Sequence, residues 1–140
     1  MPGGVLARDL GFKEKPYNRK APQGDTTLLY VNELQNSPGK SIVGIRVELP
    51  GGAETPPHTH GGAFVTVVVI EGQMLNKMDD NPLMVFKAGE SFFEHTCCHH
   101  VVSANVSKTE KAVLLATLIV ETETAKGGMN ALFVIDKEYC

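Results

Sequence analysis

Short apolar segments with alternating polar positions recur along most of the chain. In Ser41–Leu49 (SIVGIRVEL), every second residue from Val43 to Leu49 is apolar, and Arg46 and Glu48 lie between them. Successive side chains on a β-strand point to opposite faces, so this period of two is typical of a strand. The alternation therefore predicts a strand with its apolar face towards the core.

Two segments are apolar at almost every position. Ala63–Glu71 (AFVTVVVIE) is the segment richest in β-branched residues, which favours a strand buried on both faces. Ala112–Thr122 (AVLLATLIVET) is apolar throughout, so periodicity alone does not separate a helix from a strand there. The β-branched residues near its ends and the many neighbouring strands favour a strand.

Further strand-forming segments follow at short intervals, and no segment carries a helical stripe over three turns. Turn-forming residues separate them, as at Asp79–Pro82 and Lys87–Glu90. The additional predicted strands are Thr27–Leu34, Gln73–Met78, Leu83–Phe86, Ser91–Glu94, His100–Ala104 and Ala131–Asp136. So many short strands at close spacing predict an all-β sandwich or barrel.

The length of 140 residues is typical of one domain with one hydrophobic core. Residues 1–27 carry many charges together with Pro2, Pro16 and Pro22. This composition predicts an N-terminal arm with little regular structure of its own, which packs on the body or on a partner subunit. We expect residues 28–140 to form the β-barrel domain.

Composition and charge narrow the class of function. Lys and Arg number 13 and Asp and Glu 16, a net charge of -3, so the basic surface that nucleic-acid binding needs is missing. The apolar runs are far shorter than the roughly 20 residues of a membrane span, and residues 1–20 lack the apolar segment of a signal peptide. The three cysteines, Cys97, Cys98 and Cys140, do not fit a secreted disulfide framework. We therefore expect a cytoplasmic protein with reduced thiols, without nucleic-acid or membrane partners.

All five histidines lie between residues 58 and 100. His58 and His60 are two residues apart, so on a strand both rings point to one face and can share a metal ion. Neutral imidazole is a common ligand for Zn, Fe, Cu and Ni, although two exposed strand histidines have the same spacing. A second group, His95, His99 and His100, follows after a predicted hairpin, and a small barrel can bring the two groups together.

The first pair of histidines lies in a recognisable motif. Gly52-(x5)-His58-x-His60, followed by Gly72, resembles the first cupin motif, G(x)5HxH(x)3-4E(x)6G. The spacing back from Gly72 places the acidic residue of that motif at Val65. The usual fourth protein ligand of a cupin metal site is therefore missing from this strand.

The second group resembles the second cupin motif, G(x)5PxG(x)2H(x)3N, through Gly89-(x5)-His95-x-Cys97-(x2)-His100. His95 stands where the motif has Pro, and Cys97 stands where it has Gly. The final Asn position is Ala104. The match is therefore looser here than in the first motif.

The resemblance covers roughly residues 40–120 and implies a small single-domain cupin, an all-β double-stranded antiparallel β-barrel or jelly roll. It also implies one divalent metal ion, Fe, Mn, Ni or Zn, in the mouth of the barrel. The implied ligands are His58, His60 and His100. His99 is an alternative ligand, and the spacing favours His100.

Two residues beside the second histidine group are candidate catalytic residues. Glu94 could replace the missing carboxylate, as a general base or as a residue that orients the ligands, and a solvent-facing carboxylate at a strand end is the alternative. His95 is the second candidate, with a loop histidine as its alternative. The candidate pocket residues are Phe64, Val65, Gln73 and Phe92. Val67, Val69 and Phe93 are expected beside them in the barrel interior.

The adjacent Cys97 and Cys98 precede His100 in a predicted loop. A thiolate there could bind a soft metal or take part in redox chemistry, and two free thiols without such a role also fit the sequence. Glycine often serves turns with positive φ, so a cysteine at position 97 is expected to strain the backbone locally.

The resemblance implies a metal-dependent enzyme acting on a small organic substrate, and dioxygenase-type oxidation is the leading interpretation. A non-oxidative isomerase, cyclase or lyase of the same fold remains open, as does a non-catalytic barrel that binds a small molecule. The resemblance also implies a homodimer, formed by paired sheets or by exchange of N-terminal segments.

Overall fold

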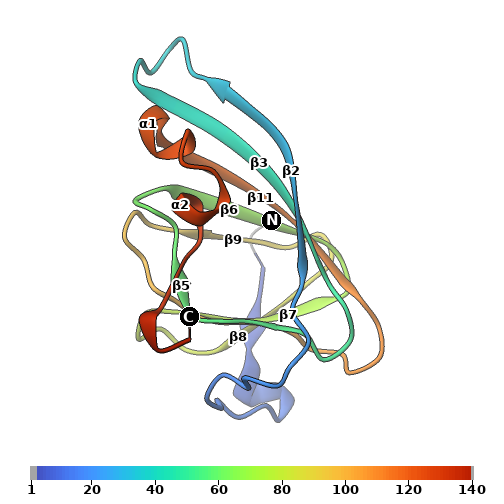
Figure 1. The fold of residues 1–140 in the computed structure, drawn as a ribbon. Helices are drawn as coiled ribbons and strands as arrows, with labels where there is room; N and C mark the ends of the chain where they lie inside the picture. The colour runs from blue at the N-terminus through green and yellow to red at the C-terminus, as the bar shows by residue number, and fades with distance from the viewer. Residues whose placement is uncertain (1–2, 140) are drawn as a thin grey trace.

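Two antiparallel β-sheets face each other in a computed structural model that describes residues 3–139 (Figure 1). The first sheet has seven strands in the order β1-β8-β7-β10-β5-β12, with β4 paired to β10. The second sheet has five strands in the order β2-β3-β11-β6-β9. The all-β antiparallel fold predicted from the sequence is confirmed.

The eight described strands of four or more residues begin and end within a few residues of the predicted bounds, whereas Val5–Leu6, Glu54–Thr55 and the helical elements were not predicted. The strands of the seven-stranded sheet are β1 (Val5–Leu6), β4 (Glu54–Thr55), β5 (His58–Thr59), β7 (Gln73–Met78), β8 (Met84–Lys87), β10 (His100–Asn105) and β12 (Val134–Ile135). Those of the five-stranded sheet are β2 (Asp25–Glu33), β3 (Lys40–Leu49), β6 (Phe64–Glu71), β9 (Ser91–Glu94) and β11 (Ala112–Glu121). The helical elements are η1 (Ala7–Leu10), α1 (Thr122–Ala125), α2 (Met129–Leu132) and η2 (Lys137–Tyr139).

The five-stranded sheet follows the alternation of its sequence. In β3, Val43, Ile45 and Leu49 are fully buried, as the period of two predicts. The prediction that Ala63–Glu71 is buried on both faces is wrong, because Val68 and Ile70 are 39% and 49% exposed. One face of β6 packs on the core while the other face is exposed. Apolar residues occur on both faces, so the apolar composition of this strand does not indicate which residues are buried.

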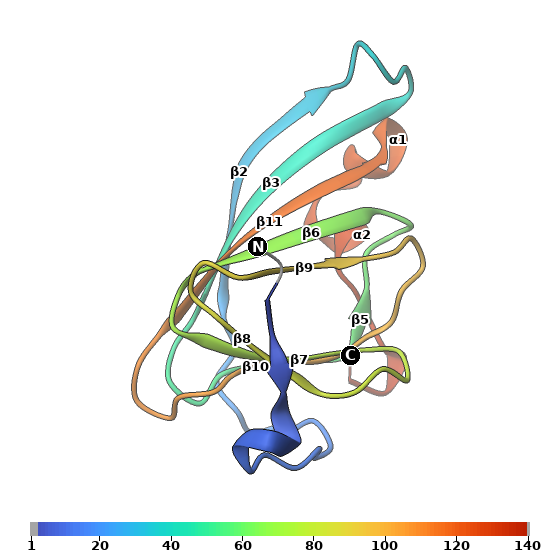
Figure 2. The same ribbon diagram turned by 180° about the vertical axis from the view of Figure 1, so that it is seen from behind.

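The seven-stranded sheet brings distant parts of the sequence together. β10 lies between β5 and β7, and its register places His100 opposite His58. Near the N-terminus, Val5 and Leu6 pair with Val85 and Met84, so β1 forms an edge of this sheet (Figure 2). The sheet therefore assembles the two histidine groups on neighbouring strands.

The C-terminal part of the chain differs from the predicted strand over Ala131–Asp136. α2 occupies its first residues, where the Phe133 N–H bonds to the carbonyl of Met129, and only Val134–Ile135 pairs in a sheet. Gly128, with φ of 75°, precedes the helical turn in a conformation that L-residues rarely adopt. Local backbone hydrogen bonding therefore overrides the β-prone composition.

A comparison within β11 tests the position of the core. Leu118 is fully buried, whereas Leu115 is 37% exposed on the other face of the same strand. Leu118→Ala is expected to lower the free energy of unfolding by about 2–5 kcal/mol, since it leaves a cavity. Leu115→Ala is expected to lower it by less than about 1 kcal/mol. Urea unfolding followed by circular dichroism measures both, and equal losses would contradict the assignment.

Candidate metal centre

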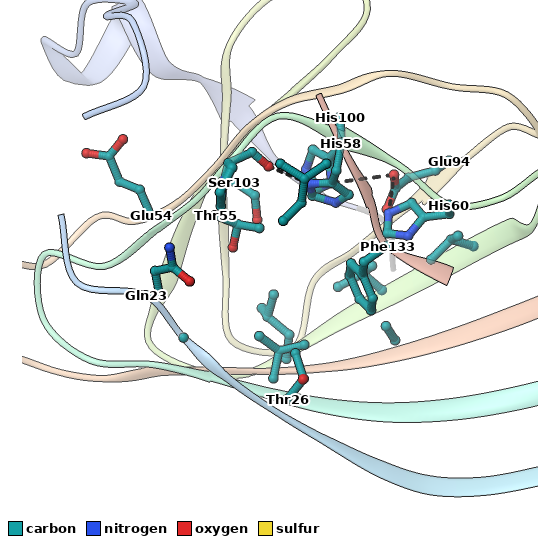
Figure 3. A pocket seen from close by; sticks show the side chains of 18 of the residues that line it. Gln23, Thr26, Glu54, Thr55, His58, His60, Glu94, His100, Ser103 and Phe133 are labelled. Atoms are coloured by element: carbon teal, nitrogen blue, oxygen red, sulfur yellow. Dashed lines mark hydrogen bonds and ion pairs between the residues drawn. The ribbon is translucent and has the colours of Figure 1, made fainter. Parts of the chain in front are cut away.

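Three buried histidines converge between the two sheets (Figure 3). His58 begins β5, His60 follows that strand, and His100 begins β10. Their exposed fractions are 2%, 6% and 5%. One ring nitrogen from each residue lies within 4.8 Å of the others, an arrangement that could hold a metal ion.

A hydrogen bond on the far side fixes each imidazole ring. His58 Nδ1 donates to the Pro56 carbonyl at 2.7 Å, and His60 Nδ1 donates to the Leu132 carbonyl at 3.0 Å. His100 Nε2 donates to the Asn76 side-chain oxygen. The other ring nitrogens, Nε2 of His58 and His60 and Nδ1 of His100, therefore point their lone pairs at the centre. Hydrogen bonds on the far side orient the rings of metal-bound histidines in the same way.

Gly61 allows the loop after His60 to approach α2 closely. Gly61 has φ of 63°, and a Cβ at this position would lie 2.2 Å from the Ala131 carbonyl oxygen. A side chain here would therefore push α2 away from the loop that follows His60. Since α2 carries the Leu132 carbonyl, Gly61 keeps the partner of the His60 ring in place.

Glu94 at the end of β9 is the fourth polar group of the cluster. Its side chain is 2% exposed, with Oε1 3.1 Å from His60 Nε2 and 3.4 Å from His100 Nδ1. The atoms are close, but the ring protons of His60 and His100 lie on the far nitrogens, so neither ring donates a hydrogen bond to Glu94. His60 Nε2, Glu94 Oε1 and His100 Nδ1 thus lack hydrogen-bond partners within the described chain.

Burial keeps two of the rings neutral. Removal from water, followed by the nearby His100 and His60 rings, lowers the pKa of His58 to about 3. Removal from water and the neighbouring His60 also lower the pKa of His100 to about 3. Neutral imidazole is the form that binds a metal, so both rings are ready as ligands at neutral pH.

The lowered pKa values predict acid destabilisation of the metal-free protein. An unfolded histidine titrates near pH 6.5, so between about pH 6.5 and 3 the unfolded chain binds more protons than the folded chain. Stability is therefore complete above this window and falls as the pH drops through it, by up to about 1.4 kcal/mol per pH unit for each histidine.

Urea unfolding at a series of pH values in the presence of a chelator measures this slope. His58→Gln removes one of the two titrating rings, so its stability should fall less steeply below pH 6.5. A slope identical to that of the natural sequence would contradict the neutral state of His58.

A cavity of about 230 Å³ lies beside the histidines. Its apolar lining includes Val65, Val67, Phe92, Leu114 and Phe133. The three histidines and Glu94 line one end of the cavity. The other polar lining residues, which Figure 3 shows on the side away from Glu94, are Gln23, Thr26, Glu54, Thr55 and Ser103. The centre therefore lies at one end of a mostly apolar pocket, the usual character of a small-molecule site.

A family model for the cupin domain matches residues 45–118, more than half of the chain. The chain belongs to the cupin family. Three buried histidines in this fold fit a metal-dependent cupin, as the resemblance implied.

Solved cupin structures resemble the chain at low sequence identity. The cupin domain of Schizosaccharomyces pombe Cnp3 is 19% identical, covering 79% of this chain and 71% of its own, with a TM-score of 0.59. A Bordetella pertussis cupin domain is 22% identical, covering 72% and 97%, with a TM-score of 0.57. An oxalate oxidase structure is 26% identical, covering 87% and 68%, with a TM-score of 0.53.

Comparison with curated proteins finds no match. Within residues 3–139, no helix has the length and apolar character needed to span a membrane.

Several predicted site residues of this cupin lie outside the pocket. Phe64 points outward and stacks on Phe93, which is 54% exposed, because both alternate with inward residues of β6 and β9. Gln73 is exposed at the start of β7. The placement of Phe64 and Gln73 in the pocket, and of Phe93 in the interior, is corrected accordingly. Val65 and Phe92 do line the pocket.

Two of the predicted histidines also lie away from the cluster. His95 is exposed after β9, where its ring packs edge-on against Phe93, so the structure does not bring this candidate catalytic residue to the centre. His99 Nε2 lies 2.8 Å from an Asp136 carboxylate oxygen. The structure therefore places His100, and not His99, with His58 and His60.

The cysteines before His100 have structural surroundings. Cys97 is exposed with φ of 63°, the left-handed conformation that a glycine would adopt without strain. Cys98 donates its S–H to an Asp79 carboxylate oxygen at 3.0 Å. Burial and this bond raise the pKa of Cys98 to about 11, which keeps the thiol protonated and unreactive. Cys140 lies outside the described residues.

Some site residues escaped the sequence interpretation. Asn76 lies among buried residues of β7 and bonds to His100; a polar residue between Met74 and Met78 in a strand was its only signal. Phe133 packs against His58 and His60 with ring centroids 5.6 and 4.9 Å away. No motif marks this residue, because its position depends on how the C-terminal segment returns to the barrel.

Proposed function

We propose that this cupin is a metal-dependent oxidoreductase of the dioxygenase type that acts on a small organic molecule. The convergence of three histidines with fixed, inward-facing lone pairs at the end of an apolar cavity carries the proposal. A weak likeness to an oxalate oxidase, an oxidoreductase of the same fold, supports it.

In this proposal His58, His60 and His100 hold one divalent ion, Fe, Mn, Ni or Zn. When bound, Fe or Mn would supply Lewis acidity and redox chemistry with O2, whereas Zn would supply Lewis acidity alone. The outer hydrogen bonds to Pro56 and Asn76 keep the rings oriented, so that binding needs little rearrangement.

The pocket walls select the substrate. Phe92, Leu114 and Phe133 present apolar surface that excludes water and packs against a carbon skeleton. The hydroxyl groups of Thr55 and Ser103 can orient oxygen atoms of the substrate. Since the residues known to line the cavity include no Lys or Arg, a small, largely apolar chelator such as an enol or a catechol suits it better than a free dicarboxylate.

Oxygen uptake tests the proposal. The protein is loaded with Fe(II) or Mn(II) and offered catechol, pentane-2,4-dione or oxalate, with His58→Ala as the matched control. We expect O2 consumption with an apolar chelator, lost in His58→Ala. Conversion of a probe without O2 would replace the proposal with an isomerase or lyase. Thermal stabilisation by a probe without conversion would replace it with a non-catalytic binding barrel.

We further propose that the chain forms a homodimer through the exposed apolar residues Leu28 and Val31 of β2. Leu28 and Val31 pair with the buried Ile45 and Val43 on the same face of the sheet, yet they are 51% and 46% exposed. β2 is also an edge strand, and an apolar edge strand readily pairs with another chain. A second copy would cover this surface.

Light scattering coupled to gel filtration tests the dimer at micromolar concentration. We expect twice the mass of one chain, and expect Val31→Asp to yield monomers because it buries a charge in the interface. Asn32→Asp on the same strand places a charge at an already polar position and should remain dimeric. A natural sequence that elutes as a monomer would refute the dimer.

A further inference from the structure

The carboxylate that the first cupin motif lacks is present on the neighbouring strand. We propose that Glu94 is the fourth protein ligand of the metal centre, supplied by β9 instead of β6. This inference rests on the proposed three-histidine metal site and assigns Glu94 a direct role as ligand, in place of the general base considered from the sequence.

Strand pairing brings the substitute carboxylate to the expected place. β6 and β9 are antiparallel neighbours, and their register sets Val65 directly opposite Glu94. Both side chains are buried on the inner face, Val65 at 0% and Glu94 at 2% exposure. Side chains of directly opposed residues lie roughly 5 Å apart, so either position can deliver a carboxylate to the same centre.

The distances around Glu94 match those between ligands of one ion. Two donor atoms bound at about 2.1 Å lie roughly 3.0–3.5 Å apart when their bonds meet at octahedral or tetrahedral angles. Glu94 Oε1 lies 3.1 Å from His60 Nε2 and 3.4 Å from His100 Nδ1. The carboxylate oxygen therefore occupies a neighbouring corner of the same coordination site.

The missing hydrogen bonds point to the same role. A buried polar atom without a partner is costly, and a buried carboxylate more so. Glu94 Oε1 and the two ring nitrogens nearest to it all lack hydrogen-bond partners among the described residues, and all three face one another. One cation between them would satisfy all three atoms at once.

A fourth ligand changes the charge of the site. Three neutral imidazoles and a divalent ion carry a net charge of +2, and the Glu94 carboxylate reduces it to +1. With no Lys or Arg among the residues known to line the cavity, a neutral or singly charged substrate suits the site better than a dianion. An oxygen ligand also suits Fe, Mn and Zn better than soft Cu(I).

Calorimetric titration of the metal-free protein with Co(II) and Mn(II) tests the inference. Glu94→Gln keeps the size of the side chain and removes its charge, and we expect at least a tenfold loss of affinity. Even outer partners of metal ligands cost about 10–100-fold when removed. The matched control is Glu54→Gln, which removes a carboxylate from the other end of the same pocket (Figure 3) and should change affinity less than about twofold.

The double variant Val65→Glu/Glu94→Val returns the carboxylate to the strand where the cupin motif has it. Since it exchanges two directly paired side chains, the filled volume stays constant, and we expect affinity to recover above that of Glu94→Val. The ligand-field absorption of bound Co(II) should change in Glu94→Gln and stay unchanged in Glu54→Gln. Circular dichroism establishes that each variant is folded before it is titrated.

The outcomes separate this inference from the proposed metal site. Unchanged affinity and Co(II) spectrum in folded Glu94→Gln, with binding lost in His58→Ala, would overturn the role of Glu94 and leave the three-histidine site intact. Absence of binding in the natural sequence would overturn both. Weaker binding in Glu94→Gln with an altered spectrum would establish Glu94 as a ligand, whether or not the double variant folds.

Discussion

Replacing His58 with alanine is expected to lower the affinity for Co(II) or Mn(II) by at least about a thousandfold. Loss of an outer partner alone costs about 10–100-fold, and loss of a ligand should cost more. The side chain of His58 is only 2% exposed, so water does not readily take the place of the lost ring as a ligand. His58 also lies directly opposite His100 in the sheet. The alanine variant therefore leaves an empty space where the ring faced the other two histidines.

The matched control for His58→Ala is His99→Ala. His99 is next to His100 in sequence but pairs with Asp136 outside the cluster, so its loss should leave the affinity within about twofold. Titration calorimetry of both variants measures the difference. Equal losses would contradict the ligand set, and a loss confined to His99→Ala would move the site to the loop.

The second large effect is the response of thermal stability to metal. A ligand at a thousand times its dissociation constant stabilises the folded state by about 4 kcal/mol. In a chain of this length that corresponds to a rise in Tm on the order of 10 °C. The reason is local: the ion links β5, β9 and β10, which carry His58, Glu94 and His100.

Differential scanning calorimetry with EDTA, and then with excess Mn(II), measures this rise. His58→Ala should have nearly the same Tm in both conditions. A similar rise in both proteins would mean that the metal acts elsewhere, and no rise in the natural sequence would mean that the centre does not bind Mn(II).

The sequence predicted strands well where side chains alternate, as in Ser41–Leu49. It failed on exposure in Ala63–Glu71, because the exposed Val68 and Ile70 have the same apolar character as the buried residues between them. It also failed at Ala131–Asp136, where backbone hydrogen bonds of a helical turn prevail over side-chain preference. Residue type indicates a preference for a strand or for burial. The exposure of Val68 and Ile70 and the helical turn near Ala131 depend instead on which neighbours the folded chain brings beside them.

The candidate site divides in the same way. The spacing of His58 and His60 and the motif around His100 predicted residues that the structure brings together. The position of Glu94 opposite Val65 depends on the register between β6 and β9, which no local pattern specifies. The Leu132 carbonyl, 72 residues from the His60 ring that it holds, depends on the path of the C-terminal segment.

A crystal structure of the protein soaked with Mn(II) or Co(II), with anomalous scattering measured at the metal edge, tests the central claim most directly. The account predicts one strong anomalous peak at bonding distance, about 2.0–2.3 Å, from the inward nitrogens of His58, His60 and His100 and from a Glu94 carboxylate oxygen. An empty centre at saturating metal, or a peak only beside His99 and the cysteine loop, would contradict it.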